Sequence, residues 1–121
     1  MAKILVVDDS EVTLSFARDC LEKDGHSVFV ARNGLEANRV IFSKNKPDLI
    51  ILDVIMPLLD GEKVLQAFRQ SEIGRNIPVV FFSTKSEKEL AAMAKKHNVR
   101  GYILKPVNAK ELKDAVRNFL K

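Results

Sequence analysis

Residues 49–53 read Leu-Ile-Ile-Leu-Asp, so that four consecutive apolar residues run directly into a carboxylate. An unbroken apolar run of this length is typical of a strand that is buried on both faces of a parallel sheet. Residues 4–7 and 79–82 have the same character, and the shorter runs 28–30 and 102–104 are also rich in β-branched or aromatic residues. The sequence therefore predicts five short strands.

Helix-length segments separate and follow these runs, and the predicted helices cover residues 11–23, 35–43, 61–70, 87–97 and 109–120. Each has one apolar stripe, which in the first helix includes Val12, Phe16 and Cys20. Three of the helices have a capping residue three positions before a glutamate: Asn33 with Glu36, Ser86 with Glu89, and Asn108 with Glu111. These start signals support the predicted boundaries.

Strand and helix thus alternate five times along the chain. Helical crossovers require parallel strands, and their right-handedness restricts the topology. We expect an α/β fold with a doubly wound, five-stranded parallel sheet and helices on both faces. At 121 residues the chain suits one domain covering residues 1–121. Ligands of such sheets bind beyond the carboxyl ends of the strands.

Composition excludes several classes of protein. Hydrophobic residues make up 46% and charged residues 30% of the chain, which disfavours intrinsic disorder. The apolar runs are far shorter than the roughly 20 residues of a membrane helix, and residues 1–7 have no signal-peptide layout. A single cysteine, Cys20, excludes an internal disulfide and is expected in the core. We therefore predict a cytoplasmic protein with no membrane partner.

The net charge of +4 and the pI of about 9.3 raise the possibility of an anionic partner. However, the lysines and arginines are spread along the chain rather than gathered in a block, which favours solvated helix faces and no direct nucleic-acid binding. No zinc-ligand spacing or Walker loop is present. His26 and His97 are expected to be exposed and far from the carboxyl ends of the strands.

Four of the five predicted strands end in polar or charged residues. The residues are Asp8-Asp9-Ser10, Asp53, Ser83-Thr84 and Lys105-Pro106. Any one of them could be an ordinary turn residue. Because the carboxyl ends of parallel strands share one edge of the sheet, the coincidence predicts a functional site at that edge.

These segments resemble the receiver domain of bacterial two-component response regulators. The matching pieces are Val6-Val7-Asp8-Asp9-Ser10, Leu52-Asp53-Val54-Ile55-Met56-Pro57 with Asp60-Gly61, Pro78-Val79-Val80-Phe81-Phe82-Ser83, and Gly101-Tyr102-Ile103-Leu104-Lys105-Pro106. The resemblance extends from Lys3 to the C-terminus. It implies the strand order 2-1-3-4-5 and a switch that catalyses only its own phosphotransfer and slow dephosphorylation.

The resemblance also implies a role for each aspartate at the ends of the first and third predicted strands. Asp53 is the expected phosphoryl acceptor. Asp9 and Asp53 are expected to bind Mg²⁺ directly, Asp8 through water, and Ile55 through its backbone carbonyl. Three carboxylates in one pocket repel one another, and oxygen ligands with open positions suit Mg²⁺. Asp60 is expected to cap the helix that starts at residue 61.

Two further residues are expected to act on the phosphoryl group. Lys105 can pair with Asp53 at rest and with a phosphoryl oxygen afterwards, and the resemblance implies a cis bond before Pro106. Ser83 can donate its hydroxyl to the phosphoryl group and, with Tyr102, forms the expected switch. Attack by water on the phosphoryl group should be slow, because the positions that influence it in the family hold Ile55 and Lys85.

The expected function is that of a phosphorylation-controlled switch. A sensor histidine kinase or histidine phosphotransfer protein would supply the phosphoryl group. The face formed by residues 87–97, 102–104 and 109–120 would then bind an output protein or a second copy of the chain.

Alternatives remain open at this point. The chain could be an excised receiver of a longer regulator, although the absence of a linker after Lys121 mildly favours a complete protein. It could also be an unphosphorylated interaction module or a metal-dependent phosphohydrolase. No separate acid or base for turnover of external substrates is evident beside Asp53.

Overall fold

Five parallel strands form one sheet in the order β2-β1-β3-β6-β7. The computed structural model describes residues 1–56 and 59–121. The five strands are β1 (Lys3–Val7), β2 (Ser27–Ala31), β3 (Leu49–Leu52), β6 (Val79–Ser83) and β7 (Gly101–Leu104). Numbered among themselves, they have the order 2-1-3-4-5, so the predicted fold is confirmed.

The five predicted helices are present with small shifts at their ends. They are α1 (Glu11–Lys23), α2 (Gly34–Ile41), α3 (Gly61–Phe68), α5 (Glu87–Lys96) and α6 (Ala109–Phe119). The predicted caps of α2, α5 and α6 are confirmed, because the side chains of Asn33, Ser86 and Asn108 each accept a hydrogen bond from the backbone N–H three residues later. No described helix is long and apolar enough to cross a membrane.

Three short elements were not predicted from the sequence. Helix α4 (Glu72–Arg75) follows α3, and its N-cap is Ser71. Strands β4 (Ile55–Met56) and β5 (Leu59–Asp60) pair antiparallel just after the end of β3. Elements of two to four residues are too short to show a hydrophobic period, so the pattern that predicts the longer elements cannot predict these three.

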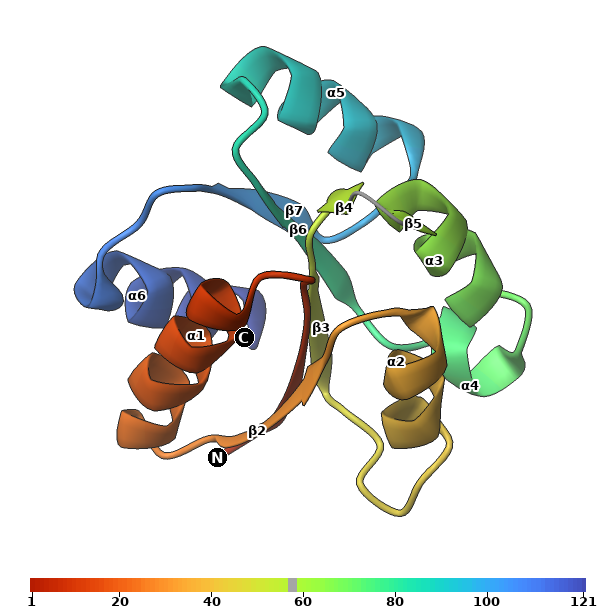
Figure 1. Cartoon of the computed structure of the whole chain (residues 1–121), viewed down its shortest axis with the longest axis horizontal. Coiled ribbons are helices and arrows are strands. Elements are labelled where there is room, and N and C mark those ends of the chain that lie inside the picture. Colours follow the sequence, from red (N-terminus) through yellow and green to blue (C-terminus); the bar gives the residue numbers. More distant parts are fainter. Residues whose placement is uncertain (57–58) are drawn as a thin grey trace.

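The helices cover both faces of the sheet (Figure 1). Helices α1 and α6 enclose one core with the sheet, and α2, α3 and α5 enclose the other. Residues 49–52, with which the fold prediction began, are all buried, because β3 lies at the centre of the sheet. One prediction is wrong: Val12 is 81% exposed, since it lies near the start of α1 beyond the sheet-facing part of the stripe.

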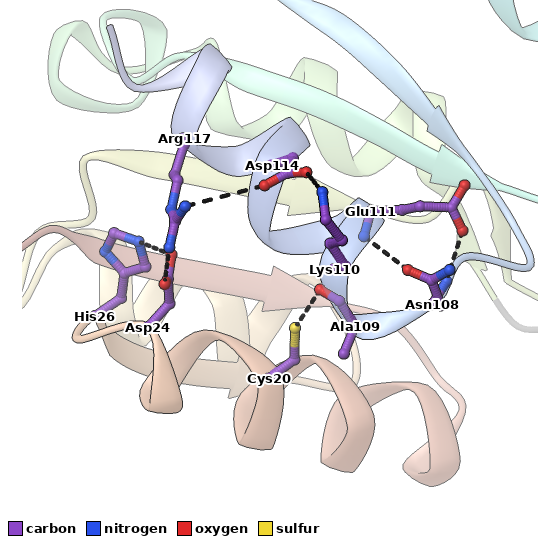
Figure 2. A network of polar contacts seen from close by, with 9 residues as sticks. All are labelled: Cys20, Asp24, His26, Asn108, Ala109, Lys110, Glu111, Asp114 and Arg117. Atoms are coloured by element: carbon purple, nitrogen blue, oxygen red, sulfur yellow. Dashed lines mark hydrogen bonds and ion pairs between the residues drawn. The ribbon is translucent and has the colours of Figure 1, made fainter.

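A polar network joins the C-terminal end of α1 to α6 (Figure 2). Arg117 on α6 forms an ion pair with Asp24, the residue that caps α1. The Cys20 thiol donates to the carbonyl oxygen of Ala109 at 3.2 Å. Cys20 is 4% exposed, which confirms its predicted place in the core. The network therefore links the two helices of this face at two points, Cys20 with Ala109 and Asp24 with Arg117.

The prediction of two exposed histidines is wrong. The side chain of His26 is 9% exposed and that of His97 is 11% exposed. His26 Nδ1 accepts a hydrogen bond from the Ala2 backbone N–H at 3.2 Å. His97 Nε2 pairs with Glu62, and its ring lies edge-on to that of Phe81. Segments remote in the sequence bury these side chains, so the local pattern gave no sign of it.

We expect His26 to make the protein less stable in mild acid. Burial lowers the pKa of His26, although the nearby Asp24 carboxylate opposes this shift. Protonation at Nδ1 would also break the hydrogen bond from Ala2. As pH falls below the ordinary histidine pKa of about 6.5, His26 takes up a proton in the unfolded chain before it does so in the folded protein. This favours the unfolded chain, so the free energy of unfolding decreases as pH falls toward the folded-state pKa. We expect a loss of about 1 kcal/mol between about pH 7 and pH 5.

Urea unfolding at the two pH values measures this loss. The matched variant His26→Asn keeps an acceptor that can face Ala2 but does not titrate. Its free energy of unfolding should change less with pH than that of the wild type. Equal slopes for the two proteins would contradict the assignment to His26.

Candidate functional site

Two aspartates stand at the carboxyl ends of neighbouring strands. Asp8 follows β1 and Asp53 follows β3, and the backbone N–H of Asp53 donates to the carbonyl of Val7 at 3.0 Å. The sheet ladder therefore sets their separation. Asp8 is 1% exposed and Asp53 is 6% exposed, whereas the adjacent Asp9 is exposed. The site thus has a buried floor and one open acidic edge.

The three carboxylates converge. One oxygen from each of Asp8, Asp9 and Asp53 lies within 4.8 Å of the others. Backbone N–H groups of Ser10 and Ile55 donate to Asp8 and Asp53, each at 2.9 Å, and hold these two carboxylates in place. A set of donors that contains only oxygen, with one exposed member, fits a hard divalent cation such as Mg²⁺.

Lys105 reaches the site from the end of β7. Its ammonium donates to Asp8 Oδ2 at 2.7 Å and lies 3.4 Å from Asp53 Oδ2. Its own backbone N–H donates to the carbonyl of Ser83 at 2.8 Å. The peptide bond from Lys105 to Pro106 is cis. At rest the ammonium therefore bridges the two buried carboxylates rather than pairing with Asp53 alone.

The site holds more negative charge than Lys105 can neutralise. Burial raises the pKa of Asp53 above its ordinary range, and the Asp8 carboxylate adds to this. The Ile55 N–H and the Lys105 ammonium oppose the shift. A bound cation would favour the ionised form of Asp53, as any nearby positive charge does.

Ser83 ends β6, the strand beside β3. It is fully buried, and its hydroxyl oxygen accepts a hydrogen bond from the Lys85 backbone N–H at 3.2 Å. A hydroxyl group also has one proton to donate. Ser83 therefore has a donor available at the same edge of the sheet as Asp53.

The other predicted residues lie around this centre. Tyr102 on β7 is half-buried, and its hydroxyl donates to Glu87 at 3.2 Å. It pairs in register with Phe81, two residues before Ser83, so it lies below the carboxylates rather than among them. Ile55 is 44% exposed. Pro57 and the side chain of Asp60, with its predicted capping role, lie outside the part of the chain that the structure describes.

Sequence reasoning missed an apolar groove beside Lys105. The groove has a volume of about 330 Å³ and runs between the start of α1 and the loop after β7. Val12, Phe16, Phe82 and Val107 contribute to its walls. Val12 belongs to the apolar stripe of its helix in the sequence, and that pattern predicts a buried residue rather than the wall of an exposed groove.

Comparison with known proteins decides the family. A family model described as the response regulator receiver domain matches residues 4–117. The chain belongs to this family. Receiver domains interact with histidine kinases and phosphotransferases, and they are signalling modules of two-component systems rather than conventional enzymes. The cluster of Asp8, Asp9 and Asp53 is typical of the magnesium site of a receiver domain.

Individual relatives agree with this membership. The chain is 33% identical over 118 residues to the sensor histidine kinase TmoS of Ectopseudomonas mendocina. The matched region is 98% of this chain but only 12% of that protein. It is 32% identical over 118 residues to sporulation initiation phosphotransferase F of Bacillus subtilis, covering 98% of itself and 93% of that protein. The structure of chemotaxis response regulator CheY4 of Vibrio cholerae matches this receiver domain with a TM-score of 0.87, 28% identity and 98% coverage of both chains.

Proposed function

We propose that residues 1–121 act as one receiver domain that takes a phosphoryl group onto Asp53 and changes its binding surface in response. The observation that carries the proposal is the Lys105 ammonium between the buried carboxylates of Asp8 and Asp53. A buried acceptor with a cation beside it suits a reaction that brings negative charge to the site.

Phosphoryl transfer from a phosphohistidine needs few parts. An oxygen of Asp53 forms the new P–O bond while the P–N bond to the donor imidazole breaks, and the imidazole nitrogen keeps the electron pair and takes up a proton. The Lys105 ammonium can follow the negative charge from Asp53 to a phosphoryl oxygen. The Ser83 hydroxyl can donate to another phosphoryl oxygen.

Asp8, Asp9, Asp53 and the backbone carbonyl of Ile55 are the groups that would hold Mg²⁺ in this proposal. The ion would supply electrostatic stabilisation of the transferring phosphoryl group. The chain's own contribution is to keep the donor oxygens together, through the backbone N–H groups that fix Asp8 and Asp53.

A phosphodonor protein must cover the open edge beside Asp9 to bring its phosphorus to Asp53. We propose that it also covers the apolar groove that includes Val12, because the groove is continuous with Lys105. The donor would be a sensor histidine kinase or a histidine phosphotransfer protein. We place the reaction in the cytoplasm, where a free thiol such as that of Cys20 is usual.

Labelling by a small acyl-phosphate donor tests the proposal. The full chain is incubated with donor and Mg²⁺, with and without a chelator, and its intact mass is followed. We expect one phosphoryl adduct that needs the metal and decays with time. No adduct would favour an unphosphorylated interaction module, and repeated turnover of other phosphoesters would favour a hydrolase. Asp9→Asn should need more Mg²⁺ for the same rate, since it loses an exposed ligand.

We expect phosphorylation to change the face formed by α5, β7 and α6. If Ser83 turns toward the phosphoryl group, its loop moves, and Tyr102 can leave Glu87 and turn inward. Amide NMR shifts upon phosphorylation should therefore extend from Ser83 through the end of α6. Shifts that stop at the phosphorylation site would contradict this. The same face is where we place an output partner or a second copy of the chain.

We also expect the phosphoryl group to last longer here than in a variant with polar residues at two positions. The Ile55 side chain cannot orient a water molecule by hydrogen bonding, and Lys85 is a cation that lies 3.7 Å from Glu89. The double variant Ile55→Asn with Lys85→Glu should lose phosphate several-fold faster, as measured by the decay of the mass adduct. Equal decay of the variant and the wild type would contradict this expectation.

A further inference from the structure

A second polar cavity opens at the amino-terminal edge of the sheet, at the opposite end of β6 from Ser83. Its volume is about 470 Å³. It is surrounded by the residue that follows α3, the last residue of α4 and the segment after it, the start of β6, and the loop before β7. Asp53 and the magnesium ligands proposed above do not contribute to it, so this cavity is separate from the phosphorylation site.

The walls of the cavity concentrate positive charge. Arg69, Arg75 and Arg100 come from three different segments and all line it, together with Asn76 and Asn98. Among the residues that the structure describes, no carboxylate lines this cavity, and none forms an ion pair with these three arginines. A concave wall with charge of one sign focuses the field and attracts ions of the opposite sign.

Backbone carbonyls hold one side of each guanidinium group. Arg69 donates to two carbonyls just after α5, Arg75 contacts the carbonyl of Arg69 at 3.5 Å, and Arg100 donates to that of Phe119 at 3.0 Å. These carbonyls lie at or just beyond the C-terminal ends of helices, where cations are favoured. A guanidinium has five N–H donors. Each group therefore has N–H donors that these carbonyls do not use, and Arg100 also lines the neighbouring cavity to which Asp48 and Phe119 contribute.

We propose that this cavity binds a small anion with two adjacent phosphate groups, of the chemical class of pyrophosphate and nucleoside diphosphates. The planar fork of arginine matches phosphate oxygens in pairs, which a lysine cannot do. A single phosphate group carries about −1.5 to −2 charges near neutral pH, which is less than three guanidinium groups can neutralise. The cavity volume lies within the range of sites for small ligands, roughly 300–1,000 Å³.

Titration of the full chain with pyrophosphate or ADP, followed by amide NMR without Mg²⁺, tests the proposal. We expect saturable binding, with the largest shifts at Arg75 to Val79 and Asn98 to Arg100. Arg75 is exposed, and its guanidinium makes one long hydrogen-bond contact within the part of the chain that the structure describes, so Arg75→Gln should fold normally and bind about tenfold more weakly. Arg75→Lys keeps the charge but not the fork and should also bind more weakly than the wild type.

Arg39→Gln is the matched control, because Arg39 is an exposed arginine on α2 and does not line the cavity. It should bind like the wild type, and so should Asp53→Asn, which separates this proposal from the one on phosphorylation. Tighter binding of ADP than of pyrophosphate would identify a nucleotide as the ligand, and equal binding would identify the diphosphate group alone. Both results support the site.

Three results would overturn the proposal. The first is the absence of saturable binding by either ligand. The second is an equal loss of affinity in Arg39→Gln and Arg75→Gln, which would indicate a general effect of net charge. The third is comparable or tighter binding of a single-stranded oligonucleotide, with shifts spread over many basic residues, which would indicate an extended nucleic-acid surface.

Discussion

Asp53→Asn is expected to abolish labelling by an acyl-phosphate donor while the fold is retained. Asparagine has nearly the shape of aspartate but lacks the charged oxygen that attacks phosphorus. Asp53 alone lies between the Asp8 end of β1 and the Ser83 end of β6, with the Lys105 ammonium 3.4 Å from its Oδ2. In the described part of the chain, no other carboxylate both lies at the centre of the site and has a cation beside it.

The measurement is intact mass after incubation with donor and Mg²⁺. Asp19→Asn provides the matched control, because Asp19 is an exposed aspartate on α1, and it should label like the wild type. Full labelling of Asp53→Asn would place the phosphoryl group elsewhere and remove the centre of the proposed function.

The same variant should be more stable than the wild type in metal-free buffer. Burial and the Asp8 carboxylate disfavour the ionised form of Asp53, and asparagine removes that charge. Lys105 keeps its 2.7 Å contact with Asp8 in the variant. We expect a gain of about 1 kcal/mol in the free energy of unfolding near neutral pH, measured in urea. A loss of stability in the variant would contradict this. It would mean that the attraction between Lys105 and the Asp53 carboxylate stabilises the fold more than repulsion by Asp8 destabilises it.

Gly61→Ala is expected to destabilise the fold strongly and to slow labelling. A Cβ at Gly61 would lie 2.5 Å from the carbonyl oxygen of Asp53 and 2.5 Å from the Cα of Val54. Both are backbone atoms, so the start of α3 or the segment after β3 must move. We expect a loss of about 3 kcal/mol in the free energy of unfolding. Labelling should slow as well, because the displaced backbone carries Asp53.

Gly34→Ala is the matched control for this effect. Gly34 begins α2, and a Cβ there would make an ordinary contact of 3.6 Å with Val64. Alanine also restricts the unfolded chain and favours helix, so this variant should be as stable as the wild type or slightly more stable. Urea unfolding of both variants makes the comparison. Similar stabilities for Gly61→Ala and Gly34→Ala would show that the contact at Gly61 is relieved at little cost.

Local pattern was sufficient for the five strands of the parallel sheet, the five longer helices and the caps of three of those helices. The apolar run over residues 49–52 predicts a central strand because the side chains of a strand that is covered on both faces are all buried and therefore apolar. Asn33 and Asn108 predict helix starts because a cap and the N–H that it satisfies lie three residues apart in the chain. The acidic and basic residues at the strand ends follow by the same logic, since parallel strands end at one edge.

Contacts between distant segments were decided by the tertiary structure alone. Whether Lys105 meets Asp8 or Asp53 depends on how β1, β3 and β7 are placed, and the structure puts the ammonium between the two. Burial of His26 and His97 likewise depends on neighbours from other elements. A sequence pattern records the preferences of one segment, whereas burial and partnership belong to pairs of segments.

The arginines show the same division most clearly. Along the chain Arg69, Arg75 and Arg100 are scattered, and the sequence favoured their interpretation as parts of solvated helix faces. Folding brings the ends of α3 and α4 and the loop before β7 to one cavity and leaves no described carboxylate in its walls. The sequence by itself determined the net charge of +4. The packing of three segments that share no local pattern decided that three of the positive charges lie at one cavity.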